Sequence, residues 1–409
     1  MSVSSKEQLD KRYNEIKARG LSLDMTRGKP CAQQLDLSSG LLDCLGRDYK
    51  AADGTDCRNY GGLDGLPEAK KLFAEFLEVT PAEIIVAGNS SLALMHDSIA
   101  QAVLRGVPGS SKPWGEVAAK FLCPSPGYDR HFAVCEHLGI EMIPVRMTEE
   151  GPDMDEVERL AADESIKGIW CVPKYSNPTG VVFSDAVVDR LAKMRAAADF
   201  RVFWDNAYAV HHLTDKPRPL KNLLAACKAA GNPDRVLIFG STSKVTFAGA
   251  GVAMMAGSEA NMAYTKQNMS LQTIGPDKLN QLRHVRFFRD MAGVEAQMKK
   301  HAAILKPKFD AVTTILDREI GDSGAAQWTR PAGGYFISVD TKEGRAQAVV
   351  KMAAEAGVKL TSAGATFPHG KDPLDRNIRI APSMPTQAEI EQAMELVAIC
   401  ILGSGSLSK

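Results

Sequence analysis

The chain has 409 residues, of which 44% are hydrophobic and 24% charged, as in ordinary soluble globular proteins with a large core. Lys and Arg together number 49, as do Asp and Glu, and this balance argues against a nucleic-acid or membrane-surface partner. The eight cysteines are scattered without a CxxC pair, which argues against a metal site and a disulfide scaffold. No apolar run approaches the ~20 residues of a membrane span, so we expect a cytoplasmic protein.

Seven short, β-rich apolar runs alternate with amphipathic helical stretches through the middle of the chain. This alternation predicts an α/β fold with a mostly parallel, seven-stranded sheet. The expected strands are 83–88, 120–125, 140–147, 168–173, 201–206, 235–240 and 251–257. The helices expected to cover the sheet, with apolar residues near i, i+3, i+4 and i+7, are 66–79, 90–106 and 183–198.

The pattern changes after Gly275-Pro276 to a long, charge-rich helical run over 279–320, with a break expected near Ala292-Gly293. A last helix is predicted to open with Thr386-Gln387-Ala388-Glu389, which is a capping-box sequence. We therefore expect a smaller α+β unit after the sheet. Its short strands are predicted at 334–340, 357–362 and 377–382.

Polar residues cluster at the C-terminal ends of four expected strands, which is the edge where open α/β sheets bind ligands. These ends carry AGNSS at 87–91, KYSNPTG at 174–180, WDNAY at 204–208 and GSTSK at 240–244. Taken singly, each has a structural explanation. The NPTG segment is a good turn, Asn89 and its neighbours could cap a helix, Asp205 could cap the next segment, and Lys244 could be a solvated side chain.

Seven motifs together resemble, in their order, the fold-type I pyridoxal-phosphate aminotransferases of class I. They are Tyr60-Gly61, Gly88-Asn89-Ser90-Ser91, Pro126-Gly127-Tyr128, Asn177-Pro178-Thr179-Gly180, Asp205-x-x-Tyr208, Ser241-x-Ser243-Lys244 and Asn377-x-Arg379. The resemblance runs from Thr26 to the C-terminal helix. The segments LDMTRGKP, RNYGGLDGLPEAKKLF and STSKVTFAGAGV are most similar to bacterial aspartate aminotransferases of subgroup Ic.

This resemblance implies a large domain over 48–290 that binds pyridoxal 5'-phosphate, and a small domain from 1–47 and 291–409. It also implies a homodimer with shared active sites that acts on small amino acids and 2-oxo acids. The expected reaction moves an amino group between L-aspartate and 2-oxoglutarate by a ping-pong mechanism through a lysine Schiff base.

Three alternatives share the fold. One is an aminotransferase for aromatic amino acids, kynurenine or alanine, and another is a lyase or decarboxylase. The third is a non-catalytic module that senses an effector, as in some transcription regulators. The 25 residues before TRGKP leave no room for a DNA-binding domain, which argues against the third.

The resemblance assigns roles around the cofactor ring. Lys244 is expected to carry the aldehyde and then to move a proton, for which its pKa must fall below ~10.4, and its apolar sequence neighbours favour that shift. Asp205 is expected to pair with the pyridine nitrogen, while Asn177 and Tyr208 donate to the phenolate oxygen. Tyr128 is expected to stack on the ring.

The phosphate is expected where a helix begins at Asn89, Ser90 and Ser91, because backbone N–H groups converge there. The hydroxyls of Ser241 and Ser243 are expected to add further donors. The same resemblance implies that Tyr60 reaches across the dimer interface and binds the phosphate in the neighbouring subunit.

Substrate binding is assigned to three residues by the resemblance. Arg379 is expected to grip the substrate α-carboxylate through two parallel hydrogen bonds, which a lysine cannot reproduce. Gly28 is expected to bring the backbone close over the substrate, and Asn177 to line the same place.

Two cations that this chemistry needs have no obvious residue. Most members of the family carry an arginine shortly after the lysine to neutralise the phosphate, but no basic residue occurs from Val245 to Asn261. The candidate replacements are Lys29, Arg58 and Lys278. The candidates for binding the side-chain carboxylate of a dicarboxylic substrate are Arg27, Lys29, Lys278 and Arg283.

Overall fold

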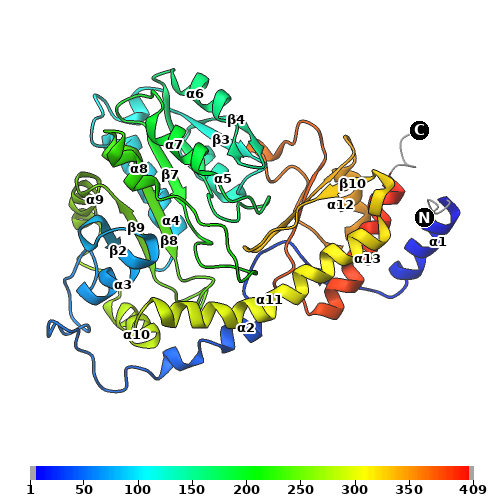
Figure 1. The fold of residues 1–409 in the computed structure, drawn as a ribbon, viewed down its shortest axis with the longest axis horizontal. Coiled ribbons are helices and arrows are strands. Elements are labelled where there is room, and N and C mark those ends of the chain that lie inside the picture. Colours follow the sequence, from blue (N-terminus) through cyan, green and yellow to red (C-terminus); the bar gives the residue numbers. More distant parts are fainter. Residues whose placement is uncertain (1–5, 405–409) are drawn as a thin grey trace.

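The computed structural model describes residues 6–404, and none of the helices in this range is long and apolar enough to cross a membrane. The cytoplasmic location stays a prediction. Figure 1 shows a larger part built around a sheet and a smaller part that holds both ends of the chain. The long helix α11 (Met291–Glu319) runs along both parts.

Eight strands form the large sheet, in the order β2-β9-β8-β7-β6-β3-β4-β5. The five strands from β8 to β4 run parallel, whereas β9 and β5 run antiparallel to their neighbours. The mostly parallel sheet and the α/β fold class are thus confirmed. The bounds are β2 Ile84–Val86, β3 Lys120–Ser125, β4 Glu141–Thr148, β5 Gly151–Pro152, β6 Ile166–Cys171, β7 Arg201–Asp205, β8 Val236–Ser241 and β9 Ala253–Gly257.

The predicted number of seven strands is one too low for the described chain. All seven predicted runs are strands, and β5 is the eighth, pairing Gly151 and Pro152 with Thr148 and Met147 of β4. A strand of two residues is too short to show a period-2 pattern, so the sequence carries no strand signal there.

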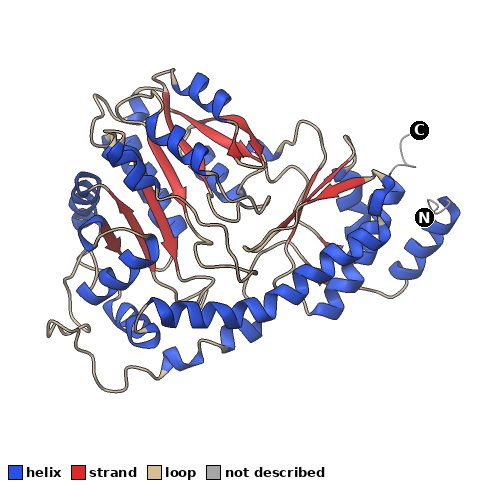
Figure 2. Ribbon diagram, in the orientation of Figure 1, coloured by secondary structure: helices blue, strands red, loops and turns tan. Residues whose placement is uncertain are grey.

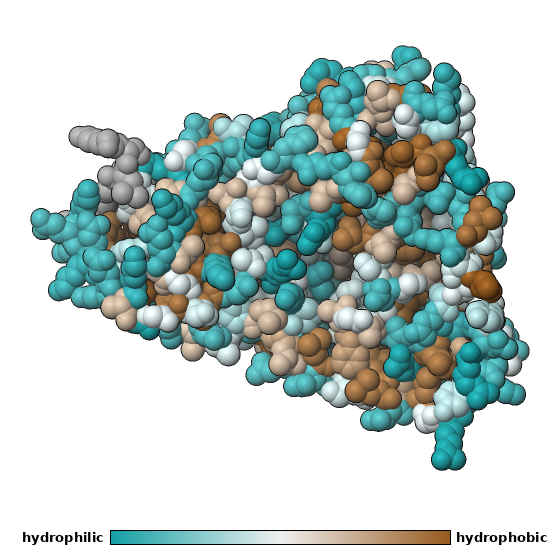
Figure 3. All heavy atoms as spheres, turned by 180° about the vertical axis from the view of Figure 1, so that it is seen from behind, coloured by the Kyte–Doolittle hydropathy of each residue, from teal (hydrophilic) through white to brown (hydrophobic). Residues whose placement is uncertain are grey.

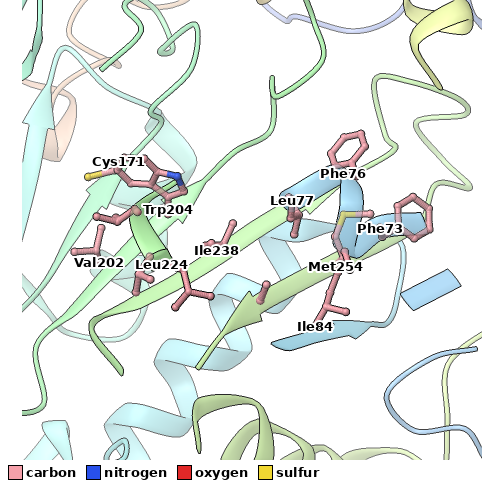
Figure 4. Packing of buried hydrophobic residues seen from close by; sticks show 14 of the residues in the cluster. Phe73, Phe76, Leu77, Ile84, Cys171, Val202, Trp204, Leu224, Ile238 and Met254 are labelled. Carbon is pink, nitrogen blue, oxygen red and sulfur yellow. The ribbon is translucent and has the colours of Figure 1, made fainter. Parts of the chain in front are cut away.

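Helices cover both faces of this sheet (Figure 2). Successive side chains of a strand point to opposite faces, so Val202 and Trp204 enter one core while Phe203 enters the other. Figure 4 shows the first core, in which Ile238 and Met254 of the sheet pack with Phe73 of α3. The helices of the first core include α3 Pro67–Leu77, α6 Met154–Ala161, α7 Asp185–Lys193 and α8 Leu223–Ala229, and those of the second include α4 Ser91–Arg105, α5 Asp129–His137 and α9 Glu259–Gln272.

The helical run after the sheet breaks earlier than predicted. Helix α10 spans Lys278–Phe288, and α11 begins at Met291. Arg289 has a φ of 69°, and the Asp290 side chain accepts a hydrogen bond from the Gly293 N–H at 2.9 Å. Because Asp290 caps the new helix, Ala292-Gly293 lies inside its first turn and not at the break.

The smaller part has an antiparallel sheet in the order β10-β11-β13, and its core draws on both chain ends. Leu9 and Ile16 of α1 share this core with α13, which opens with the predicted capping box. The domain bounds 48–290 and 1–47 plus 291–409 stay a prediction, and residues 1–5 and 405–409 lie outside the described chain. The elements here are α1 Lys6–Lys17, β1 Leu23–Asp24, α2 Ala32–Asp36, β10 Ala326–Trp328, β11 Ile337–Thr341, α12 Ala346–Glu355, β12 Val358–Lys359, β13 Asn377–Ile380 and α13 Gln387–Gly403.

The outer surface is mixed in character. On the face opposite to that of Figure 1, apolar patches lie among hydrophilic residues (Figure 3). Large apolar side chains that are exposed in the described chain include Tyr60 (81%), Leu271 (73%) and Ile274 (65%).

Candidate functional site

A cavity of about 610 Å³ lies where the parallel strands end, between the large sheet and the smaller part. Asp205 and Ser241 reach it from the ends of β7 and β8, and Arg379 reaches it from β13. The cavity therefore combines segments that are far apart in the chain. The predicted site residues that line it are Gly28, Ser90, Ser91, Tyr128, Asn177, Asp205, Tyr208, Ser241, Ser243, Lys244 and Arg379.

Two predicted site residues do not line this cavity. The Asn89 side-chain amide donates to the Gly249 carbonyl at 3.4 Å, and the Asn89 carbonyl accepts from the Ser243 hydroxyl at 3.3 Å. Asn89 thus braces the segment around Lys244 from outside. Tyr60 lies on the surface of the chain, so its role toward a neighbouring subunit stays a prediction.

Lys244 follows directly on β8, in the turn after Ser241. Its Nζ lies 5.3 Å from the ring centroid of Tyr208 and 5.9 Å from that of Tyr335. Burial lowers the pKa of Lys244 below its usual 10.5, and the negative charge of Asp205 partly opposes this shift. Lys244 is therefore an amine whose neutral form is favoured by its surroundings.

Asp205 is a buried carboxylate with one free acceptor. Its Oδ2 lies 3.0 Å from Nε2 of His131, whose ring stacks on Trp170 with centroids 4.2 Å apart. Its Oδ1 is buried and has no hydrogen-bond partner in the described chain. A buried carboxylate oxygen without a donor costs free energy, so this atom calls for a donor from a bound molecule.

The tyrosines of the cavity stay protonated at neutral pH. Burial raises the pKa of Tyr128 to about 12, and Asp205 adds to the shift. Burial likewise raises the pKa of Tyr208 well above 10, with smaller contributions from Tyr128 and Asp205. Both hydroxyls can therefore act as hydrogen-bond donors.

The start of α4 presents free backbone donors to the cavity. Ser90 is the residue before the first helical turn, and its side chain makes no capping hydrogen bond. The first N–H groups of a helix have no partner within the helix, and they lie at the positive end of its dipole. Ser90 and Ser91 both line the cavity, so this end of the 15-residue helix suits an anion.

Arg379 is almost completely buried, with 6% of its side chain exposed. Its Nη1 donates to Oδ1 of Asp129 at 2.8 Å and to Oδ1 of Asn177 at 3.3 Å. Its Nη2 lies 3.4 Å from the Thr361 hydroxyl, and its guanidinium carbon lies 4.9 Å from the ring centroid of Phe336. Its Nε has no partner in the described chain.

Gly28 lies where the N-terminal segment crosses the smaller part. A Cβ atom at this position would lie 2.7 Å from Cζ of Phe336 and 3.2 Å from Cβ of Tyr335. No side chain fits without moving these residues, which explains why the segment carries glycine here.

Five cationic side chains and two carboxylates line the cavity. The cations are Arg27, Lys29, Arg130, Lys244 and Arg379, and the carboxylates are Asp129 and Asp205. This excess of positive charge favours an anionic ligand. No group of three metal-ligating side chains occurs in residues 6–404.

Three of the cations considered from the sequence do not reach the cavity. Lys278 is buried, and its Nζ donates to the carbonyls of Asn59 (2.6 Å) and Gly61 (2.7 Å), so it holds the loop that carries Tyr60. Arg58 pairs with Asp56, and Arg283 donates to Asn280 of its own helix. Arg27 and Lys29 do line the cavity.

Sequence reasoning missed three consecutive site residues, Asp129, Arg130 and His131. They form the first turn of α5, directly after the quoted motif Pro126-Gly127-Tyr128. Their position in the chain is the signal that could have identified them. The first turn of a helix that follows a strand end also faces the ligand-binding edge of the sheet.

Comparison with known proteins gives a consistent set of relatives. The family model described as aspartate amino-transferase matches residues 2–407. The chain is 50% identical to a putative aminotransferase of Mycolicibacterium smegmatis, covering 98% of this chain and 95% of that protein. It is 49% identical to an aspartate aminotransferase of Corynebacterium glutamicum, covering 97% and 92%.

Solved structures agree with this grouping. The crystal structure of a putative aminotransferase from Corynebacterium diphtheriae superposes with a TM-score of 0.96 at 50% identity, covering 98% of this chain and 99% of that one. The structure of an aspartate transaminase from Corynebacterium glutamicum also gives a TM-score of 0.96, at 47% identity, and covers 98% and 95%.

Proposed function

The chain belongs to the aspartate amino-transferase family and is an aminotransferase, and on this premise we propose that it uses pyridoxal 5'-phosphate to move an amino group between L-aspartate and 2-oxoglutarate in a ping-pong reaction. When bound, the cofactor supplies an electron sink that eases removal of the proton on the substrate Cα. The observation that carries the proposal is that Lys244, with its lowered pKa, and Asp205, with its unpartnered oxygen, line one cavity.

The residues present fit the cofactor. The free Oδ1 of Asp205 would accept the N–H of a protonated pyridine ring, and His131 on Oδ2 would hold the carboxylate in place. The uncapped start of α4, with Ser90 and Ser91, would take the phosphate together with the hydroxyl of Ser243. Lys29 is the only one of the three proposed replacements for the phosphate arginine that lines the cavity in the described chain.

Lys244 would hold the cofactor and then move the proton. Its Nζ must be a neutral amine to accept a proton, and burial lowers its pKa in that direction. The negative charge of Asp205 favours the charged form of Lys244 and so opposes part of this shift. The same negative charge would keep the proton on the pyridine nitrogen. Tyr208 and Asn177 would donate to the ring oxygen, since both line the cavity and Tyr208 stays protonated.

The cavity charge supports a dicarboxylic substrate. We propose that Arg379 binds the α-carboxylate and that the side-chain carboxylate meets one of Arg27, Lys29 and Arg130, which are the remaining cations of the lining. The name of the Corynebacterium glutamicum relative supports aspartate as the amino donor. The amino acid and the 2-oxo acid would occupy the same place in turn.

The first experiment tests cofactor and reaction class together. The visible absorbance of the purified protein is recorded before and after adding aspartate, and oxaloacetate is measured. We expect a coloured protein that bleaches while one oxaloacetate forms per site. In Lys244→Ala, borohydride treatment should no longer attach the cofactor to the protein, as judged by mass. A colourless wild type, or attachment that persists in the variant, would refute the proposal.

The second experiment tests the substrate. Initial rates are compared across aspartate, glutamate, alanine, phenylalanine, tyrosine and kynurenine with a fixed oxo acid, and we expect the two acidic donors to be fastest. If alanine or an aromatic donor leads, the substrate assignment is wrong while the aminotransferase class stands. Release of oxo acid without amino transfer would instead indicate the lyase or decarboxylase alternative.

We also propose that the chain forms a homodimer in which Tyr60 reaches the partner's cavity. Tyr60 lies on a loop that touches the segment after α9, where a Cβ on Gly275 would lie 2.5 Å from the Gly61 carbonyl. Leu271, near the end of α9, and Ile274, which directly precedes Gly275, have exposed apolar side chains. An exposed apolar patch of this kind is commonly covered by a partner.

A further inference from the structure

Arg379 already holds a carboxylate that belongs to the chain itself. The Asp129–Arg379 contact at 2.8 Å joins the first residue of α5 to β13 of the smaller part, 250 positions apart in the sequence. The two partners differ in their exposure, since 6% of the arginine side chain is exposed but 34% of the aspartate side chain. Asp129 is thus the partner that can turn to water.

We propose that Asp129 is a placeholder carboxylate, which occupies Arg379 until the α-carboxylate of a substrate displaces it. The inference rests on the proposed function, in which Arg379 binds that α-carboxylate. A buried guanidinium without an anion would be costly, so the substrate-free enzyme needs a counter-ion at this point. Asp129 supplies it without closing the site.

The geometry of the contact favours displacement. Asp129 reaches only Nη1, while Nε has no partner and Nη2 has a weak contact of 3.4 Å to Thr361. A substrate carboxylate can accept two parallel hydrogen bonds from a guanidinium, whereas Asp129 accepts one. The fork of Arg379 is therefore better satisfied by the ligand than by the placeholder.

Two positive features can stabilise the Asp129 carboxylate after it is displaced. It is the first residue of α5, and the positive end of a helix dipole stabilises a carboxylate there. Arg130 follows it and lines the same cavity. Asp129 nevertheless stays close to the bound ligand, so its charge lowers the affinity for every carboxylic acid that enters, and it favours release of the product.

A clamp that orients Arg379 is the rival interpretation of the same contact, and it predicts the opposite sign. If Asp129 held the guanidinium in place for the substrate, removing its charge would weaken ligand binding. If Asp129 competes with the ligand, removing its charge would strengthen binding. The sign of one measured change therefore separates the two.

The test measures the dissociation constant of succinate, a dicarboxylic acid that cannot be transaminated, by calorimetry on the cofactor-loaded enzyme. In Asp129→Asn we expect succinate to bind roughly tenfold more tightly, because a negative charge near the ligand is lost. Asp185→Asn is the matched control, since Asp185 is the exposed first residue of α7 and lies outside the cavity. Its succinate affinity should equal that of wild type.

Kinetics add a readout that a structural defect would not mimic. The KM values for aspartate and 2-oxoglutarate should both fall in Asp129→Asn, with kcat unchanged or lowered by slow release. Arg379→Gln should lose succinate binding in either background. If Arg379→Gln binds succinate normally, Arg379 does not bind the substrate carboxylate, and the placeholder role of Asp129 is refuted as well. If Arg379→Gln loses binding but Asp129→Asn binds equally or more weakly, the placeholder alone is refuted.

Discussion

At the scale of single residues, the free oxygen of Asp205 gives a direct prediction. Asp205→Asn replaces a carboxylate by a neutral amide that cannot hold a proton on a pyridine nitrogen. We expect turnover to fall at least ~10²-fold while the cofactor stays bound, because ring protonation is what makes the ring an electron sink. Turnover and cofactor absorbance are measured in the same preparation.

Asp189→Asn is the control for this prediction, since Asp189 lies on α7 and pairs with Lys221 outside the cavity. It should retain wild-type turnover. Near-normal turnover in Asp205→Asn would remove Asp205 from its proposed role, and loss of the cofactor would show that the residue serves binding before it serves chemistry.

The sequence predicts the site residues that belong to recognisable motifs. It does not predict the residues that form hydrogen bonds with them. Lys244, Asp205 and Arg379 follow strand ends or motif order, and all three line the cavity. His131 and Asp129 were not predicted, because their partners lie 74 and 250 positions away in the chain. Only the fold brings such pairs together, and the one local signal for these two residues is their position in the first turn of α5, after a strand end.

At the scale of elements, α10 ties together the segments that surround the site. Gln281 accepts from the Leu66 N–H and donates to the Val86 carbonyl, and Asn280 donates to the carbonyls of Ala250 and Gly251. The glycine-rich segment after Lys244 is therefore held by hydrogen bonds from α10. A Cβ atom on Gly251 would lie 3.1 Å from the backbone nitrogen of Ser243, so a small residue at this position suits the close packing of the segment on itself.

His284 of α10 holds the turn that contains Lys244, through one threonine on each side of the lysine. Its Nδ1 lies 2.8 Å from the Asn280 carbonyl, which can only accept, so the proton is on Nδ1 and Nε2 accepts from the hydroxyls of Thr242 (3.1 Å) and Thr246 (2.9 Å). Burial lowers the pKa of His284 from 6.5 to about 4. Protonating Nε2 would turn it into a donor, so the threonine hydroxyls would have to turn and accept from it.

This lowered pKa predicts an acid-sensitive fold. Between pH 6.5 and about 4 the unfolded chain binds a proton at His284 that the folded chain does not, so the free energy of unfolding falls as the pH falls through this window. The share of His284 is about 3 kcal/mol. Urea unfolding of the wild type and of His284→Gln at pH 7 and pH 4.5 measures it.

His284→Gln should lose less stability than the wild type between these two pH values, since glutamine does not titrate. The exposed His137 on α5 provides the control, and His137→Gln should keep the wild-type dependence. An equal loss in His284→Gln and wild type would show that the other buried histidines account for the acid sensitivity.

Element prediction from sequence succeeds where the pattern is long. The seven apolar runs are strands and the capping box at Thr386 opens α13, because periodicity and capping are local signals. The break between α10 and α11 was misplaced, since Gly293 looked like the breaker while Asp290 is the cap. The two-residue β5 has no pattern of its own to read.

At the scale of the whole molecule, the site needs both parts and both chain ends. Arg27 and Lys29 come from the N-terminal segment, whose β1 pairs with β12 of the smaller part, and Arg379 comes from β13. A movement of the smaller part would therefore carry the substrate-binding side chains as a group. The sequence implied this arrangement only through the family resemblance, because composition and periodicity do not place segments in space.

The proposed homodimer predicts that two inactive variants restore each other. If Tyr60 serves the partner's cavity, a hybrid dimer of Tyr60→Ala and Lys244→Ala chains has one site with both defects and one site that is fully native. Random exchange of an equal mixture makes half of the dimers hybrid, so about a quarter of the sites should regain activity. If Tyr60 serves its own chain's cavity, every site in the hybrid has one defect and activity stays absent.

The exchange is made by mild denaturation and refolding of the mixed variants, and activity is compared with each variant refolded alone. The double variant Tyr60→Ala/Lys244→Ala mixed with wild type is the matched control, because each hybrid then has one defect in each site under the shared arrangement and one native site under the unshared one. The two mixtures therefore give opposite changes on hybrid formation. Sedimentation of the refolded mixtures reports the dimer, and a monomeric protein that is nevertheless active would refute the shared site outright.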